Sequence, residues 1–501
     1  MSETHDERMN LLPRASAELV AACAGAQLTE AESMARRFVA THPGDEAGWQ
    51  VLLKCVEQGG DLGETERLAR LALERFPALP RAHFVLAAAV AQRGRLREAA
   101  GLLHGRPLTG DEGLLLAEID LALDREEARR IYAEYARAAP AHPVVALGLR
   151  GAESLCAARD RGAAVAFLLT EEWHGWIQRP IADALDAEGI AYVATTKPWT
   201  LAAHRPRVVV LSSPNPPLMQ GLRAALPGAR LVNTRHGISV NGKNYGLYAA
   251  ASCDHVCVSS ESHGRRTREL AMLADDRVWV TGYPQMDGLF RRLREAAAPP
   301  VKGGRRVLFA PTFNPELSAA FLVGEDPVSA IRGNDEEIAV VLAGHPHLRR
   351  VAPQLLAAWR RLSETRPNVE FLDSCASNVI AALAEADLLV SDVSSVAMQF
   401  LALDRPLVRL VDEDRARATR AYAPDGEEWE ISAAATTVSS RADLAGAVRS
   451  ALTGNEPSRI RASRKRLQER YFGTLTDGRA GERIAQRIAA LLRDARAGGD
   501  T

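Results

Sequence analysis

The sequence has few aromatic residues and none of the common signs of a secreted or membrane-spanning protein. Aromatic side chains make up 5% of its 501 residues, so the cores must consist mainly of Leu, Val, Ile and Ala. No apolar run approaches the ~18 residues of a membrane span, and the polar, acidic start MSETHDERMN is not a signal peptide. The 6 cysteines contain no CxxC pair. These absences favour a reducing, cytoplasmic location.

Several sequence motifs of common enzyme classes are also absent. No GxGxxG follows an apolar strand, and neither GxxxxGK[ST] nor GxSxG occurs. These absences argue against NAD-dependent oxidation, a P-loop kinase and the common hydrolase elbow. The formal net charge of -1 argues against a protein that coats nucleic acid, which is usually strongly basic. We therefore expect no nucleic-acid partner.

One short cysteine cluster allows two interpretations. Cys253 and Cys257 flank Asp254 and His255, and these residue types can bind a metal. The run HVCVSS also reads as an apolar strand with buried thiols, and the spacing favours this interpretation. We therefore assign no metal site.

The N-terminal part contains a helical repeat. Residues 1–20 read as a flexible tail, and 21–150 as tetratricopeptide-like repeats. The segments MARRFVATHP and LARLALERFP end at Pro43 and Pro77, which are 34 residues apart, the tetratricopeptide period. A looser copy ends at Pro140. The repeats form either a docking surface for a protein partner or a helical cap on the next domain.

The rest of the chain alternates short apolar strands with helical segments, which is typical of α/β domains with parallel sheets. We expect one Rossmann-like domain over 160–298 and a nucleotide-binding domain over 303–478. PPVKGG at 299–304 is a plausible hinge, and 479–501 forms a C-terminal helix and tail. This is the GT-B arrangement, in which two α/β domains face a cleft, preceded here by an all-α domain. Ligands of such sheets bind beyond the carboxyl ends of the strands.

Polar clusters stand at five of the places where a strand should end. Together they are what a cleft lined by strand ends would produce. The clusters are Arg235-His236-Gly237, Gly282-Tyr283-Pro284, Ala310-Pro311-Thr312, Gly344-His345-Pro346-His347 and Ser391-Asp392-Val393-Ser394-Ser395.

These clusters, in this order, resemble the motifs of the CDP-glycerol glycerophosphotransferase family, which includes the teichoic acid polymerases. The matches span roughly 230–481. The correspondences, family motif first, are His-Gly with His236-Gly237, Thr-Gly-Tyr-Pro-Arg-x-Asp with Thr281-Gly282-Tyr283-Pro284-Gln285-Met286-Asp287, Ala-Pro-Thr-Trp with Ala310-Pro311-Thr312-Phe313, His-Pro with His345-Pro346, Asp-Tyr-Ser-Ser with Asp392-Val393-Ser394-Ser395, Asp-Arg-Pro with Asp404-Arg405-Pro406, and Asp-Gly-Lys-Ala with Asp477-Gly478-Arg479-Ala480. The chain departs from the family at Val393, Gly344 and Phe313, where an aromatic, a basic residue and a tryptophan are usual.

The resemblance implies transfer of glycerol phosphate, or another polyol phosphate, from a CDP-activated donor to a glycan or glycolipid acceptor in envelope or capsule polymer synthesis. It implies that His236 and His345 are catalytic. It also implies that no nicotinamide or flavin is needed, and it does not decide whether a divalent metal is required. Relatives often act at the inner face of the membrane, so peripheral contact there is a second expectation.

The residue types agree with this chemistry. An imidazole titrates near neutral pH, so His236 is a candidate base for the acceptor hydroxyl, with hydrogen bonding to the donor phosphates as the alternative. Gly237 lets a ligand approach the backbone. His347 is expected on the solvent side.

The donor phosphates have their own candidates. Ser394 and Ser395 precede a helix, where hydroxyls and free N–H groups favour a phosphate, although Ser394 also suits a simple N-cap. Thr312 is a further candidate contact, with turn chemistry as its alternative. Asp392 would repel phosphate unless it binds a ribose hydroxyl or a cation, and we place it on the donor side.

The acceptor side is less defined. Arg235 and His174 are candidates, with a surface loop as the favoured alternative for His174. The acidic run at 425–432 reads as a solvated loop, with a loop on the cleft side, as the family often has here, as the alternative. Two other functions stay open: a GT-B glycosyltransferase or epimerase that uses a UDP- or CMP-sugar, and a non-catalytic interaction protein.

Overall fold

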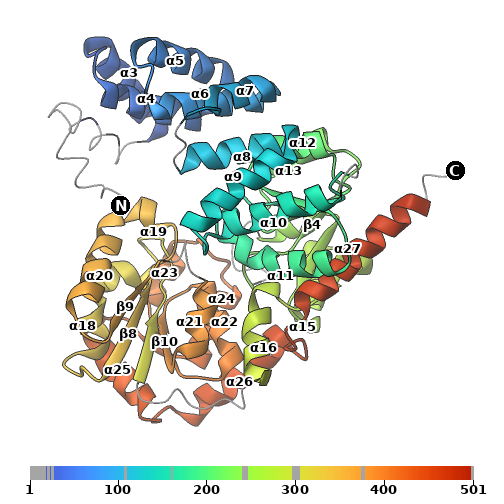
Figure 1. The fold of residues 1–501 in the computed structure, drawn as a ribbon. Helices are drawn as coiled ribbons and strands as arrows, with labels where there is room; N and C mark the ends of the chain where they lie inside the picture. Colours follow the sequence, from blue (N-terminus) through green and yellow to red (C-terminus); the bar gives the residue numbers. More distant parts are fainter. Residues whose placement is uncertain are drawn as a thin grey trace. The chain divides into compact units, whose positions relative to one another are not determined.

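The chain divides into two compact units. They consist of Met1–Ala138 with Trp199–His204, and of Ala139–Pro198 with Arg205–Thr501 (Figure 1). The computed structural model describes residues 19, 23, 27–106, 110–158, 162–239, 246–295, 305–373 and 378–497. The tail expected at 1–20, apart from Leu19, and the hinge expected at 299–304 lie outside the described residues.

The first unit is helical. Helix α3 starts at Leu28 and α5 at Leu62, 34 residues later, which matches the period in the sequence. Ala35 and Ala69 occupy equivalent places in α3 and α5, and both are fully buried, because a methyl group lets neighbouring helices approach closely. The helices are α3 (Leu28–Thr41), α4 (Glu46–Gly59), α5 (Leu62–Arg75), α6 (Pro80–Gln92), α7 (Leu96–Leu103), α8 (Asp111–Leu123), α9 (Arg125–Ala138) and α12 (Pro198–His204).

The second unit begins with α10 (Pro143–Ala157), which packs against the strand β2 and the helix α11. A Cβ on Gly151 of α10 would lie 2.8 Å from the backbone nitrogen of Ala194 in β2, so helix and strand are in close contact. The sequence assigned residues up to 150 to the helical repeats. The two compact units instead divide at residue 138, because α10 packs on the first sheet.

The first sheet is fully parallel, with the order β2-β1-β3-β4-β5-β6. Its strands are β1 (Val165–Leu168), β2 (Tyr192–Thr195), β3 (Val208–Leu211), β4 (Arg230–Asn233), β5 (His255–Val258) and β6 (Val278–Val280). The helices of this part are α11 (His174–Ala187), α13 (Pro216–Ala225), α14 (Gly246–Ser252), α15 (Glu261–Ala271) and α16 (Asp287–Glu295), with the 3-10 turns η1 (Asp275–Arg277) and η2 (Pro284–Met286).

The second sheet is also parallel, with the order β12-β11-β10-β7-β8-β9. Its strands are β7 (Arg305–Phe309), β8 (Ile338–Ala343), β9 (Val369–Leu372), β10 (Leu388–Ser391), β11 (Leu407–Leu410) and β12 (Thr436–Val438). Its helices are α17 (Ala319–Val323), α18 (Pro327–Arg332), α19 (Leu348–Val351), α20 (Pro353–Thr365), α21 (Val379–Glu385), α22 (Ser395–Phe400), α23 (Glu413–Ala418), α24 (Glu427–Glu430) and α25 (Arg441–Leu452), with the turns η3 (Leu401–Leu403) and η4 (Ile431–Ala434).

Both faces of this sheet are covered, which explains its continuous apolar strands. Along β7, Val307 and Phe309 belong to one buried cluster and Leu308 to another. The first cluster includes Trp359 of α20, and the second includes Phe400 of α22. Successive side chains of a strand point to opposite faces, so one strand serves two cores.

The end of the chain returns to the first sheet. Ser259 and Ser260, just after β5, donate hydrogen bonds of 2.6 Å to the carbonyl oxygens of Tyr471 and Arg470, at the end of α26 (Ser458–Phe472). The last helix, α27 (Ala480–Ala497), then packs on α11. These contacts tie the two α/β halves together on the side of α15 and α11. Within the described ranges, no helix has the length and apolar character needed to cross a membrane.

Candidate active site

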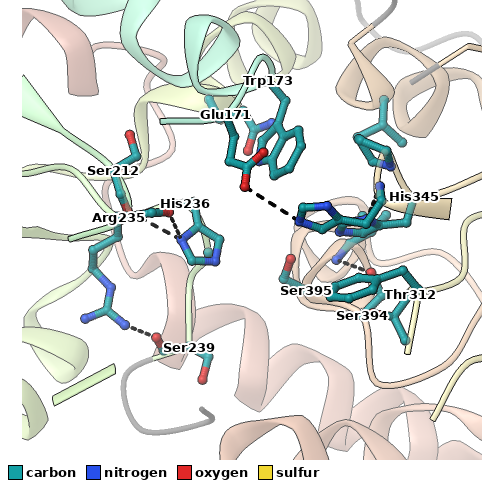
Figure 2. A pocket seen from close by; sticks show the side chains of 18 of the residues that line it. Glu171, Trp173, Ser212, Arg235, His236, Ser239, Thr312, His345, Ser394 and Ser395 are labelled. Atoms are coloured by element: carbon teal, nitrogen blue, oxygen red, sulfur yellow. Dashed lines mark hydrogen bonds and ion pairs between the residues drawn. The ribbon is translucent and has the colours of Figure 1, made fainter. Parts of the chain in front are cut away.

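A cavity of about 620 Å³ is lined by residues that follow strands of both sheets. The carboxyl ends of parallel strands meet at one edge of a sheet, and ligands bind there, where the strand order reverses. That reversal lies between β1 and β3 in the first sheet and between β7 and β10 in the second. Figure 2 shows the two walls facing each other, with His236 on one and His345 on the other. Lining residues from the strand ends include Glu171, Trp173, Ser213, His236, Thr312, Phe313, His345, Ser394 and Ser395.

His236 stands on a short connection after β4 and is held through one of its ring nitrogens. Its Nδ1 lies 2.8 Å from the Ser213 hydroxyl and 3.4 Å from the Ser212 carbonyl oxygen. The other ring nitrogen, Nε2, is directed away from these partners (Figure 2). Gly237 follows, and a Cβ built there would lie 3.7 Å from Cβ of Ser395 on the opposite wall.

His174 lies behind this wall. It is fully buried at the start of α11 and is not among the residues that line the cavity. Its Nε2 lies 3.1 Å from the Ser213 hydroxyl and its Nδ1 3.3 Å from that of Thr170. The sequence placed His174 on the acceptor side or in a surface loop. Its burial corrects both, because the turn into α11 directs the ring toward Ser213 rather than into the cavity.

His345 lies on the opposite wall, after β8. Its Nδ1 accepts a hydrogen bond of 3.1 Å from the backbone N–H of His347. In the neutral ring, Nε2 must therefore carry the proton. The ring packs at 4.7 Å from Phe313 and 5.9 Å from Trp173, measured between centroids. The sequence placed His347 on the solvent side, but it lines the cavity and stacks at 5.1 Å on His345.

Gly344 replaces the basic residue that is usual before His-Pro in the family. A Cβ at this position would come within 2.5 Å of Cδ2 of Leu356 and 3.4 Å of Trp359. A larger side chain would therefore collide with α20. Glycine at this position thus allows close packing between the end of β8 and α20.

Asp392 is turned away from the cavity. Its carboxylate is fully buried and accepts hydrogen bonds from the backbone N–H groups of Thr312 (3.0 Å), Ala319 (2.8 Å) and Ser394 (3.0 Å). Burial raises its pKa to about 6, opposed by these amides. The sequence placed Asp392 on the donor side. It does not line the cavity, because its carboxylate joins the loops after β7 and β10 from behind.

Thr312, Ser394 and Ser395 all line the cavity. Ser394 is the N-cap of α22, and its hydroxyl accepts from the N–H of Val396 at 3.3 Å. Ser394 therefore caps the helix and lines the cavity at the same time. The three residues thus form one polar ledge, which Asp392 supports.

Arg235 lines the cavity with its backbone in the left-handed region, at φ 60°. Its guanidinium donates to the carbonyl oxygen of Ser239. Burial lowers the pKa of Arg235, against the opposing charges of Glu427 and Glu428. The sequence allowed two interpretations of the acidic run at 425–432, a solvated loop or a loop on the cleft side. Glu427 is 0% and Glu428 5% exposed, and Glu428 lines the cavity, so this part of the run lies on the cleft side.

Cys257 of β5 and Cys253, which precedes that strand, are both buried. Burial raises the pKa of the Cys253 and Cys257 thiols to about 12, so both are protonated at neutral pH. Within the described residues, the metal-capable group whose ligand atoms lie within 4.8 Å of one another belongs to the first unit instead. It consists of His104, Asp120 and Glu127, and His104 is already paired with Asp120 at 3.4 Å.

Sequence reasoning missed Ser213, Gln285 and Tyr422 of the cavity wall. Ser213 follows the apolar run RVVVL, so the rule that polar residues at strand ends line the site would have found it. Gln285 lies in η2, within the motif matched at 281–287, at the position where the family has arginine. Tyr422 lies between α23 and α24, and nothing in the sequence marks it.

Comparisons with known proteins agree with this geometry. A sequence profile of the family described as CDP-Glycerol:Poly(glycerophosphate) glycerophosphotransferase matches residues 172–490. No protein with a curated description matches by sequence. The wall teichoic acid polymerase TagF superposes with a TM-score of 0.51 at 12% identity, covering 75% of this chain and 98% of that one. UDP-GlcNAc 2-epimerase from Neisseria meningitidis superposes with a TM-score of 0.40 at 12% identity, covering 65% and 98%.

The likeness to TagF concerns the fold, and it agrees with two parallel-sheet domains in a GT-B arrangement. The profile match carries the family, because it spans more than half of the chain and contains both walls of the cavity. This protein therefore belongs to the CDP-glycerol:poly(glycerophosphate) glycerophosphotransferase family and is a transferase of that kind.

Proposed function

We propose that the second unit moves glycerol phosphate, or a similar polyol phosphate, from a CDP-linked donor to a hydroxyl of a glycan or glycolipid. One observation carries this proposal: His236 and His345 come from different sheets and line the same cavity. Between them they offer a ring nitrogen that can accept a proton and one that can donate. The cavity volume of about 620 Å³ falls in the range of small-molecule sites.

The proposed reaction is a displacement at phosphorus. The acceptor oxygen bonds to the phosphorus that carries glycerol, while the bond from that phosphorus to the bridging pyrophosphate oxygen breaks. CMP leaves with this oxygen, and the acceptor loses its proton. The products are CMP and an acceptor joined to glycerol by a phosphodiester.

The two histidines suit different parts of this step. His236 is the proposed base, because an imidazole titrates near neutral pH and its Nδ1 is held by the Ser213 hydroxyl on the cavity wall. His345 is the proposed proton or hydrogen-bond donor to phosphoryl oxygens, because its Nδ1 is occupied by a backbone N–H. Such a donor stabilises negative charge that develops in the transition state.

The polar ledge of Thr312, Ser394 and Ser395 is the proposed donor-phosphate side. Hydroxyl and backbone N–H groups bind phosphate without adding charge. Asp392 supports the ledge from behind rather than touching the donor. Arg235 stays our proposed acceptor-side residue.

The surroundings of the reaction are proposals of the same kind. An envelope-polymer acceptor would require the enzyme to work in the cytoplasm at the inner face of the membrane, through peripheral contact. The helical first unit is the proposed docking surface for a protein partner. Both ideas rest on the family and on the repeat in the sequence.

The direct test is CMP release and phosphodiester formation from CDP-glycerol, with a lipid-linked glycan as acceptor. His236→Ala and His345→Ala should each lower kcat by about 100- to 10,000-fold, the usual contribution of a proton-transfer group. His255→Ala is the matched control, because that ring stacks on Trp279 at 4.4 Å and does not line the cavity. It should keep wild-type turnover.

Ligand binding separates the donor classes. A ligand at a hundredfold excess over its Kd stabilises the folded state by about 2.7 kcal/mol, so thermal unfolding will reveal a true donor. Stabilisation by CDP-glycerol or CDP-ribitol supports the proposal. Stabilisation by UDP-GlcNAc or a CMP-sugar alone would replace it with the glycosyltransferase or epimerase function. No response to any nucleotide would favour a non-catalytic interaction protein.

A further inference from the structure

Four side chains in the first wall of the cavity form a continuous hydrogen-bonded series. Thr170 Oγ1 lies 3.3 Å from Nδ1 of His174, and Nε2 of the same ring lies 3.1 Å from the Ser213 hydroxyl. The Ser213 hydroxyl in turn lies 2.8 Å from Nδ1 of His236. Three of the four side chains follow strands β1, β3 and β4, and His174 begins α11. The series therefore joins adjacent strand ends behind the reacting face.

The group at one end of the series favours one direction for these hydrogen bonds. The Ser212 carbonyl oxygen, 3.4 Å from Nδ1 of His236, can only accept, so it favours a proton on that nitrogen. With Nδ1–H donating to Ser213 as well, the Ser213 hydroxyl directs its own hydrogen to Nε2 of His174. His174 then carries its proton on Nδ1, facing Thr170.

The burial of His174 agrees with this order. Burial and the nearby His236 hold the pKa of His174 well below its usual range, so the ring is neutral and one nitrogen has a lone pair to accept with. The ring centroids of His174 and His236 are 6.1 Å apart. A neutral His174 does not oppose the positive charge that His236 would acquire on taking a proton.

We propose that Ser213 and His174 are a positioning pair that holds His236 in its Nδ1–H tautomer through the hydrogen bonds on the Nδ1 side of the ring. The tautomer of a histidine is set by the hydrogen bond that its other nitrogen makes, and the wrong tautomer cannot act as a base. This inference rests on the proposed role of His236 as the base. In this role Ser213 and His174 act through His236 and do not themselves take the acceptor proton.

Two readouts test the pair. Selective 15N labelling of histidine reports the tautomer of each ring directly and needs no substrate, and His236→Gln identifies the signal of His236. The wild type should show His236 protonated at Nδ1. Ser213→Ala should shift this signal toward a mixture of tautomers.

Kinetics with CDP-glycerol give the second readout. Ser213→Ala and His174→Leu should each lower kcat by about 10- to 100-fold, a large part of what a general base supplies, with KM for the donor within about threefold. His174→Gln should recover most of the loss, because its side-chain carbonyl can accept from Ser213 as Nε2 does. Ser154→Ala is the matched control. Its hydroxyl serves the backbone of Tyr192 at 3.3 Å, and it should be without effect.

The double variant S213A/H174L adds a further check. Two residues that act through one path give a combined loss close to that of either alone, whereas independent losses multiply. If folding suffers in S213A, the comparison of H174Q with H174L carries the same information.

A His236 ring protonated at Nε2 in the wild type would overturn the inference, and so would unchanged turnover in S213A. If CDP-glycerol is not a substrate, the proposed function fails, while the 15N spectrum still decides the tautomer.

Discussion

Gly237 and Ser395 face each other across the cavity, one after a strand of the first sheet and the other at the start of α22 in the second half. A Cβ on Gly237 would lie 3.7 Å from Cβ of Ser395 and 4.0 Å from its hydroxyl oxygen. The two walls therefore approach within one side chain of each other here. Gly237 directly follows His236, and Ser395 belongs to the polar ledge, so this narrow place lies beside both.

This spacing predicts separate effects on folding and on function. Gly237→Ala makes only ordinary van der Waals contact, so the thermal midpoint should stay within about a degree of wild type. The added methyl group narrows the path of the donor, and KM for CDP-glycerol should rise about tenfold or more, as when one methylene group is misfitted in a pocket. Steady-state kinetics measures the change in KM, and thermal unfolding measures the midpoint.

The control is Gly221→Ala on α13, where no atom lies within 4 Å of the added Cβ. It should leave KM unchanged. If Gly237→Ala also keeps wild-type KM, the donor does not pass between these walls.

Asp392→Asn should lower stability more than it directly affects chemistry. The carboxylate accepts from three backbone N–H groups, those of Thr312, Ala319 and Ser394. The amide offers one oxygen and turns an NH₂ group toward at least one of these donors. A buried donor without an acceptor costs about 1–3 kcal/mol, so the free energy of unfolding measured with urea should fall by that amount.

Asp387→Asn is the comparison for that experiment, because its carboxylate accepts from one backbone N–H, that of Arg306, at 2.8 Å. Asp387→Asn should lower the free energy of unfolding clearly less than Asp392→Asn does. Equal stability of Asp392→Asn and wild type would show that the carboxylate does not hold the ledge in solution.

The strand ends could be predicted from sequence because apolar β-branched runs stop abruptly at polar residues, as RVVVL does before Ser212. That pattern is local and places His236, Thr312, His345 and Ser394 at the correct edge of each sheet. It says nothing about which way a side chain turns once the strand has ended.

His174 and Asp392 show this limit. Both follow strands as a site residue should, yet both are fully buried behind the cavity wall. The burial of His174 depends on the docking of α11, where Gly175 lies so close to Pro143 that a Cβ would sit 2.7 Å from its carbonyl oxygen. Such a contact joins distant segments and leaves no periodic signal in the sequence.

Substitution of Trp173 tests whether its ring contacts hold His345 in place. Its ring meets His345 and His347 edge-on, at 5.9 and 5.1 Å between centroids. Aromatic pairs contribute about 0.5–1.5 kcal/mol each beyond burial, so Trp173→Ala should lower kcat/KM by about tenfold. Trp173→Phe keeps an edge for both rings and should retain most of the activity. Equal turnover of Trp173→Ala and Trp173→Phe would show that Trp173 does not hold His345 in place.

Acid sensitivity of the helical unit should trace in part to His204. The ring is partly buried at the end of α12, and burial together with Arg125 lowers its pKa to about 4. In the unfolded chain the pKa of His204 has its ordinary value of about 6.5. Below this pH the unfolded chain therefore binds the proton more readily than the folded one. Stability contributed by this group is therefore complete above pH 6.5 and falls as the pH drops toward 4.

At pH 5 the loss from this one group amounts to about 2 kcal/mol. Hydrogen exchange of α9 and α12, corrected for intrinsic rates, should show weaker protection at pH 5 than at pH 7.5 in the wild type. His204→Leu cannot take up a proton and should lose most of this difference. His42→Leu, at an exposed histidine that follows α3, should keep it. A pH dependence that survives unchanged in His204→Leu would mean that the ring is hydrated in solution and that the acid sensitivity arises elsewhere.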